Sequence, residues 1–85
     1  MTIADRILDT RERQNLTLQQ FAKKVGSTRQ MVWKYESGEK TPSVKRAYAW
    51  AKKLGADPVQ WVTAVLQQKV HESGLSFKVR VKEGR

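Results

Sequence analysis

Apolar residues recur at intervals of three and four along most of the chain, the spacing that gives an α-helix one buried face. Capping residues and glycines divide this pattern into five segments. The expected helices begin after Thr2, Thr17, Thr28, Ser43 and Asp57, and they end near Gln14-Asn15, Gly26, Gly38, Gly55 and Gly74. Two starts carry an additional signal: Gln20 completes a capping box with Thr17, and Pro58 takes the first helical position.

The inward positions of these segments define the expected core of one small domain. They are Ile3, Ile7 and Leu8, then Phe21, Ala22 and Val25, then Val32 and Tyr35, then Val44, Ala47, Trp50, Ala51 and Leu54, and finally Trp61, Val62, Val65 and Leu66. We expect Trp50 and Trp61 to pack together, with Tyr35 nearby.

Residues 75–82 follow a different period. Four apolar residues alternate with polar ones in this segment: Leu75, Phe77, Val79 and Val81. A period of two indicates a half-buried β-strand. No other segment is predicted as a strand, and a lone strand leaves its edges unpaired. We therefore expect the strand Leu75–Lys82 to pair with the same strand of a second copy across a two-fold axis. A tail packed on the helices and a disordered terminus are the alternatives. The chain thus divides into a helical domain, 1–72, and a candidate dimerisation arm, 73–85.

The composition narrows the class of partner. The 85 residues suffice for one domain with a modest core. Lys and Arg number 17 against 8 Asp and Glu, which gives a net charge of +9. This excess favours a polyanionic partner, because neutralising phosphates releases condensed counterions. Charge alone leaves open DNA, RNA, a membrane surface and a merely solubilising surface.

The sequence offers little for catalysis. Without cysteine, disulfides and thiolate metal sites are excluded, and a reducing cytoplasm fits. His71 is the single histidine, and we expect it to face solvent rather than to act as a base or ligand. There is no glycine-rich phosphate loop, no zinc-ligand cluster and no apolar run long enough to span a bilayer. Charged residues near the start, among them Asp5 and Arg6, leave no signal-peptide core. We expect a cytoplasmic protein that is not an enzyme, needs no metal or cofactor and does not enter a membrane.

The second and third predicted helices are short and joined by a brief turn containing glycine, which is the arrangement of DNA-reading helix-turn-helix units. Ala22 is small where the helices cross, Gly26 tolerates the positive φ of the turn, and Val32 points inward. The outward face of the third helix then presents Arg29, Gln30, Trp33 and Lys34 as candidate base-reading residues. In the major groove an arginine pairs with guanine O6 and N7, a glutamine with adenine N6 and N7, and a lysine reaches guanine or a phosphate.

A wider set of spaced positions supports this interpretation. It comprises Arg11, Leu16-Thr17, Phe21-Ala22, Val25-Gly26, Thr28, Val32, Glu36-Ser37-Gly38, Pro42-Ser43 and Leu54-Gly55. From Ile7 to Leu66 the chain resembles the Cro/C1-type, or XRE-type, helix-turn-helix family of phage and bacterial regulators. The resemblance implies a mainly α, five-helix lambda-repressor-like domain with helix 29–36 as the recognition helix. It also implies a sequence-specific regulator of transcription that binds double-stranded DNA.

Particular residues take roles from this resemblance. Family members often pair an arginine at the position of Arg11 with a glutamate at that of Glu36, which implies a structural ion pair. Where Leu18 stands, many members have a glutamine that bonds a phosphate, so Gln19 or the backbone amides are expected to take that role. Trp33 replaces a small or polar residue, and either it packs on a sugar or thymine methyl, or it packs against a neighbouring loop.

Further phosphate contacts follow from position near the ends of helices, where free backbone N–H groups attract anions. The expected phosphate-binding set is Gln19, Thr28, Lys40, Ser43, Lys45 and Arg46. Other lysines are assigned to the solvated surface, namely Lys52, Lys53, Lys69 and Lys78.

The expected mechanism is a homodimer whose recognition helices lie about 34 Å apart and enter successive major grooves of an inverted-repeat operator. Repression would follow from occluding a promoter, and activation through a surface patch stays open. The main alternative is an antitoxin or protein-interaction module that binds a toxin and regulates its own gene. A second alternative is a nucleic-acid binder without sequence preference, which would lose affinity equally on all sequences as salt rises.

Overall fold

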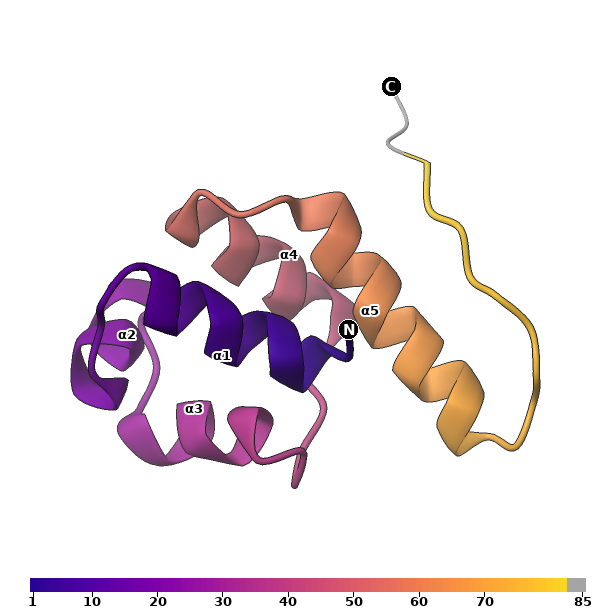
Figure 1. Ribbon diagram of the computed structural model, residues 1–85, viewed down its shortest axis with the longest axis horizontal. Coiled ribbons are helices and arrows are strands. Elements are labelled where there is room, and N and C mark those ends of the chain that lie inside the picture. Colours follow the sequence, from indigo (N-terminus) through magenta and orange to yellow (C-terminus); the bar gives the residue numbers. More distant parts are fainter. Residues whose placement is uncertain (83–85) are drawn as a thin grey trace.

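Five α-helices follow one another in the computed structural model, which describes residues 1–82 (Figure 1). They are α1 (Ile3–Arg13), α2 (Leu18–Val25), α3 (Arg29–Glu36), α4 (Val44–Leu54) and α5 (Pro58–Glu72). The prediction of five helices is confirmed, and each helix is preceded by the expected capping residue.

Local hydrogen bonds explain where the helices start. The Thr17 hydroxyl accepts a bond from the Gln20 backbone N–H at 3.1 Å, and the Gln20 side chain accepts one from the Thr17 N–H at 2.9 Å. Thr2 and Asp5 make the same reciprocal pair at the start of α1. Such boxes satisfy two N–H groups that the first helical turn leaves unbonded.

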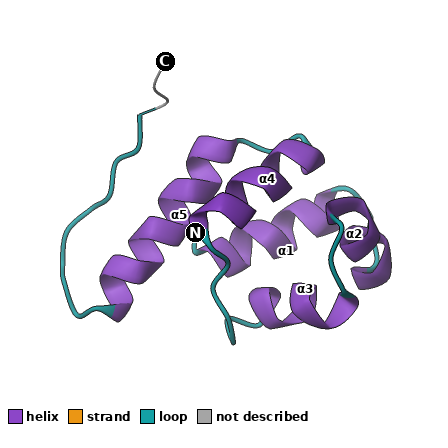
Figure 2. Cartoon of the chain, turned by 180° about the vertical axis from the view of Figure 1, so that it is seen from behind, coloured by secondary structure: helices purple, strands orange, loops and turns teal. Residues whose placement is uncertain are grey.

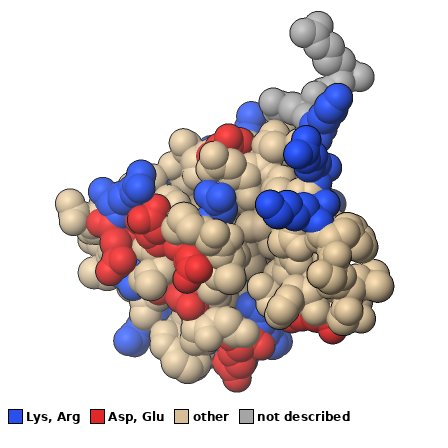
Figure 3. Space-filling view, turned by 45° about the vertical axis from the view of Figure 1, so that its right-hand side comes forward, with Lys and Arg blue, Asp and Glu red and all other residues tan. Residues whose placement is uncertain are grey.

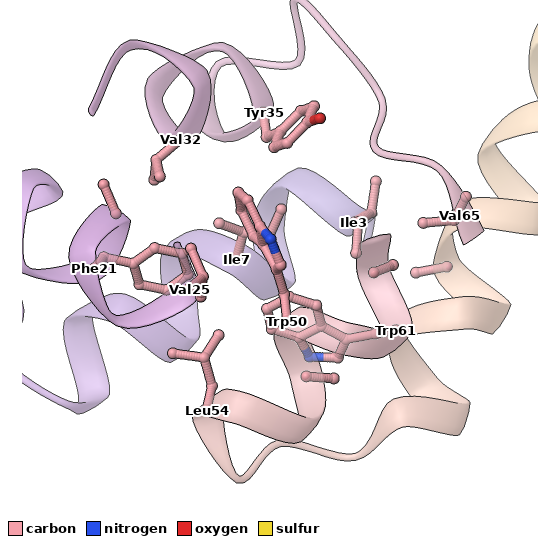
Figure 4. Close-up of a cluster of buried hydrophobic side chains, with 14 residues drawn as sticks. Ile3, Ile7, Phe21, Val25, Val32, Tyr35, Trp50, Leu54, Trp61 and Val65 are labelled. Atoms are coloured by element: carbon pink, nitrogen blue, oxygen red, sulfur yellow. The ribbon is translucent and has the colours of Figure 1, made fainter. Parts of the chain in front are cut away.

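The buried residues form one cluster to which all five helices contribute (Figure 4). Trp50 of α4 packs edge-on against two other rings, with centroids 5.4 Å from Tyr35 and 5.9 Å from Phe21. Trp61 belongs to the same cluster. Aromatic rings favour such edge-to-face contacts, so Trp50 joins α2, α3 and α4 in a single core.

Contacts between neighbouring helices connect all five of them. α4 lies against α5 and also contacts α2, while α1 contacts both α3 and α5 (Figure 2). The predicted inner stripe of α5 is partly wrong, because Val62 and Leu66 are only half-buried whereas Ala64 is buried. At 3.6 residues per turn, Ala64 shares a face with Trp61 and Val65, and the other two positions lie to one side of it.

The C-terminal segment corrects the prediction of a strand. Residues 75–82 form no strand, and among the described residues no other strand is present to pair with them. The segment turns back after α5 and runs beside that helix (Figures 1 and 2). Val79 and Val81 are half-buried, whereas Leu75 and Phe77 are 57% and 56% exposed. Within one chain the arm therefore packs in part on the helices, which corresponds to the alternative of a packed tail. Its last three residues, 83–85, lie outside the described part.

One side chain of α5 holds this segment in place. The Gln67 amide nitrogen donates to the Phe77 carbonyl at 3.0 Å, and the Val79 N–H donates to the Gln67 amide oxygen at 2.9 Å. An amide that bonds both a C=O and an N–H of an extended chain substitutes for a neighbouring strand at that point. The alternating pattern predicted a strand, but a ladder needs a second strand, and residues 1–82 supply none.

Candidate nucleic-acid interface

The turn between α2 and α3 is built by Gly26, whose φ of 73° is left-handed. Its N–H bonds the Lys23 carbonyl at 3.3 Å, and the next N–H, of Ser27, bonds the Ala22 carbonyl at 2.8 Å. These two bonds are the Schellman pattern that ends a helix and satisfies its last carbonyls. The Lys53 ammonium group donates to a further carbonyl, that of Val25, at 3.3 Å. The turn therefore has a defined geometry that fixes how α3 leaves α2.

The inner side of α3 is anchored by two residues. Val32 is fully buried, and Tyr35 is almost fully buried. Thr28 caps the helix, since its hydroxyl accepts a bond from the Met31 N–H at 3.1 Å. Because only two of the eight residues of α3 are buried, most of the helix surface stays outside the core.

The end of α3 is tied to α1 by an ion pair. Arg11 Nε lies 2.7 Å from one Glu36 carboxylate oxygen, and Nη2 lies 3.1 Å from the other. The remaining Arg11 nitrogen, Nη1, donates to the Leu16 carbonyl at 2.9 Å. The bond to Glu36 raises the pKa of Arg11 above its ordinary value. This fork-to-fork geometry is the strongest form of a carboxylate–guanidinium contact, and it places Arg11 in the scaffold.

The four candidate base-reading residues lie together on the outward side of α3. Arg29, Gln30 and Trp33 are exposed, and Lys34 is half-buried. Together with Leu18 of α2 they line one open groove of about 490 Å³. The structure thus gathers these side chains around a single surface feature at the edge of the fold where α3 lies (Figure 1).

The six candidate phosphate-binding residues flank α3 at both ends. Gln19 is exposed in the first turn of α2, and Thr28 is exposed at the start of α3. The other four follow α3 in the loop and in the first turn of α4, all of them exposed: Lys40, Ser43, Lys45 and Arg46. Along the sequence, hydroxyl, amide and cationic groups therefore precede and follow α3.

Besides Thr28, which caps α3, two of these residues also have structural partners. The Ser43 hydroxyl caps α4 by accepting the Arg46 N–H at 3.1 Å. The Arg46 guanidinium donates to the Tyr35 hydroxyl at 2.7 Å, which satisfies the polar end of a core tyrosine. Since a guanidinium carries five N–H donors, Arg46 keeps donors for another partner.

Comparison with known proteins agrees with this geometry. Residues 7–61 match the family model described as HTH_3: Helix-turn-helix. The chain belongs to the helix-turn-helix family HTH_3. The predicted membership of the Cro/C1-type, or XRE-type, regulators is thereby confirmed.

A solved structure shares the fold. It is that of an HTH_3 family transcriptional regulator from Vibrio cholerae, which superposes with a TM-score of 0.62 at 23% sequence identity. The alignment covers 82% of this chain but 37% of that regulator, so the chain spans little more than a third of its length. No match was found among curated proteins.

Two residues of this HTH_3 chain have roles that sequence reasoning missed. Lys53 was assigned to the solvated surface, yet it bonds the last carbonyl of α2. Gln67 carried no signal at all, because its partners lie on a segment whose path depends on tertiary structure.

His71 is exposed, and residues 1–82 contain no cluster of three or more metal-binding side chains. None of the helices in this part of the chain has the length and hydropathy needed to cross a bilayer.

Proposed function

We propose that this HTH_3 chain is a sequence-specific regulator of transcription that inserts α3 into the major groove of double-stranded DNA. The observation that carries the proposal is the outward group of exposed Arg29, Gln30 and Trp33 with half-buried Lys34, on a helix whose opposite side is anchored in the core. The major groove of B-DNA admits an α-helix, and its base edges offer distinct patterns of donors and acceptors. A helix with outward arginine, glutamine and lysine carries matching groups.

The flanking residues support a defined position on the duplex. Contacts to phosphates set the register and orientation of a protein on DNA, whereas contacts to base edges select the sequence. Groups on both sides of α3, such as Gln19 before it and Lys40 after it, suit the two strands that border one groove. The net charge of +9 adds the general attraction on which such contacts depend.

Selection of bound duplexes from a random pool tests the proposal directly. A specific regulator will enrich one motif, and its affinity ratio over random DNA will stay large as salt rises. In Arg29→Ala, we expect a loss of about 1–3 kcal/mol on the selected site together with relaxed choice at one base pair. The matched control is Lys69→Ala on the exposed surface of α5, which removes one positive charge elsewhere. Equal losses for both variants on every sequence would indicate a general nucleic-acid binder.

We further infer that the chain acts as a homodimer and represses by covering a promoter at an inverted repeat. The support for the homodimer comes from the C-terminal segment, residues 75–82. Alternate residues of an extended chain direct their backbone groups to opposite edges. Since the C=O of Phe77 and the N–H of Val79 bond Gln67, an extended segment would turn the backbone groups of Lys78 and Arg80 to the other edge. A second copy of the same segment is the partner that such an edge fits.

A matched pair of variants tests the dimer. Arg80→Pro removes a charge and the outward N–H, whereas Arg80→Ala removes the same charge and keeps the N–H. Sedimentation should show a dimer for Arg80→Ala and mostly monomer for Arg80→Pro. Lysines and arginines line this segment (Figure 3), and like charges on paired strands repel. Self-association without DNA should therefore strengthen as salt rises. A dimer that survives deletion of residues 75–85 would place the interface elsewhere.

A further inference from the structure

The groove beside α3 is lined by both apolar and polar side chains. Leu18 of α2 and Trp33 of α3 provide its apolar side chains. Arg29, Gln30 and Lys34 line the same groove. The volume of about 490 Å³ is open to solvent, so a flat edge of a larger molecule can enter it.

Trp33 is not placed there by the needs of the core. Its side chain is 54% exposed, and it is the one large hydrophobic residue of α3 that is exposed. The core aromatic positions of this region are filled by Phe21, Tyr35 and Trp50. More than half of the surface of Trp33 is therefore available to a partner, and an indole offers a large flat apolar face.

Leu18, which lines the same groove as Trp33, is held in a fixed position. It is the first residue of α2, directly after the Thr17–Gln20 capping box that fixes the start of the helix. It is half-buried and packs against the core cluster. One side of the groove is therefore pre-organised, which lowers the entropy that binding would lose.

We propose that Leu18 and Trp33 form a subsite for the C5-methyl group of thymine, so that the operator carries a thymine where this groove meets it. The inference rests on the proposed insertion of α3 into the major groove. Among the four bases, thymine alone presents an apolar group on the major-groove edge. Two apolar side chains in a groove that cationic side chains also line match a methyl group set among base acceptors and phosphates.

The cationic side chains of this groove favour a polyanion as the occupant. Arg29 and Lys34 both line it, and either can pair with a phosphate or with a base acceptor of DNA. A sugar ring is the other apolar surface of DNA, and it is present at every nucleotide. Binding through a sugar contact would not depend on the thymine methyl group. Replacing thymine by uracil therefore separates a sugar contact from a methyl contact.

The test replaces thymine by uracil, one position at a time, in the duplex recovered from the random pool. Uracil keeps every hydrogen-bonding group and lacks the methyl. We expect one position or two adjacent positions in each half-site at which uracil weakens binding about fourfold, the loss for one buried methyl group. In Trp33→Ala and in Leu18→Ala, that uracil penalty should shrink to within the error of the measurement.

Tyr48→Ala is the matched control, because Tyr48 is an exposed aromatic residue of α4 outside this groove. Its uracil penalty should equal that of the parent protein. If the protein selects a motif but uracil has no effect anywhere, or if the penalty persists unchanged in Trp33→Ala, the thymine subsite is refuted while the proposed function stands. If no motif is enriched from the pool, the proposed function fails and the subsite fails with it.

Discussion

Removing the Arg11 side chain is the perturbation whose consequence the structure defines most closely. Arg11→Ala deletes two bonds to Glu36, at 2.7 and 3.1 Å, and one bond of 2.9 Å to the Leu16 carbonyl. Leu16 lies between α1 and α2, and Glu36 is the last residue of α3. A single guanidinium therefore joins three parts of the helix-turn-helix scaffold.

The expected cost follows from what is left behind. The Glu36 side chain is 9% exposed and that of Arg11 is 20% exposed, so the variant leaves a largely buried carboxylate without its partner. Breaking a buried pair from one side costs about 3–5 kcal/mol. Since Arg11 retains some contact with water, we expect a loss of about 3 kcal/mol, at the lower end of that range. For a domain of this size, such a loss lowers Tm by roughly 12–24 °C.

Thermal and urea unfolding followed by circular dichroism measures this loss. The matched control is Arg13→Ala, because Arg13 forms a 3.0 Å pair with Asp9 in which the side chains are 79% and 40% exposed. An exposed pair of this kind contributes about 0.3–0.5 kcal/mol. If Arg11→Ala proves too unstable to fold, Arg11→Lys keeps the charge but loses the fork and should fall between the two.

The outcome that refutes the reasoning is equal stability of Arg11→Ala and Arg13→Ala. A second measurement separates the cost of an unpaired charge from the value of the pair itself. Replacing both partners by leucine removes the charge that is otherwise stranded, so the double variant should recover much of the loss. A double variant less stable than Arg11→Ala would show that the pair, rather than the unpaired carboxylate, dominates.

Two further predictions concern turns and caps. Gly26→Ala should lose about 1–2 kcal/mol of unfolding free energy because an alanine is strained at the left-handed φ of 73°. A steric clash is not the cause, since the added Cβ would meet nothing closer than Lys53 Nζ at 3.7 Å. Gly26→Asn should lose less, and equal losses in urea melts would point to a steric cause instead. The backbone N–H of Thr2 holds the pKa of Asp5 below its ordinary value of 3.8, so this carboxylate stabilises the fold above that pH and ceases to do so as the pH falls through the lowered folded-state pKa. Asp5→Asn should therefore be less stable than the parent at pH 7, and the difference should close in acid; a difference that stays constant down to pH 2 would contradict this.

The helices were predictable because the signals that define them are local. Thr17 and Gln20 stand three residues apart in sequence and bond each other in the structure. Gly26 ends α2 through bonds to residues of the preceding turn. Interactions within four residues of each other can be inferred from spacing, since helical geometry fixes which groups meet.

Long-range polar contacts were predictable only where a family pattern supplied them. The pair of Arg11 and Glu36 came from the resemblance, whereas the bond from Lys53 to the Val25 carbonyl has no counterpart in a spacing rule. The same holds for Gln67, whose partners lie ten and twelve residues further on. A lysine or glutamine at a helix surface looks the same in sequence whether it meets water or a backbone group.

The residues that attach α3 to the fold differ from the residues that are proposed to contact DNA. Val32 and Tyr35 are its only buried residues, Met31 packs in part against the core, and further attachment comes from the Thr28 cap, the α2 turn, and the bonds of Arg11 to Glu36 and of Arg46 to Tyr35. None of these contacts involves the side chain of Arg29 or Trp33. Because exposed positions away from caps and core change stability by less than about 0.5 kcal/mol, the outward residues are free to vary with the DNA sequence while the fold is kept. Under the proposed function, the charge and the apolar surface exposed on α3 are therefore available for DNA, since the contacts that attach this helix do not use them.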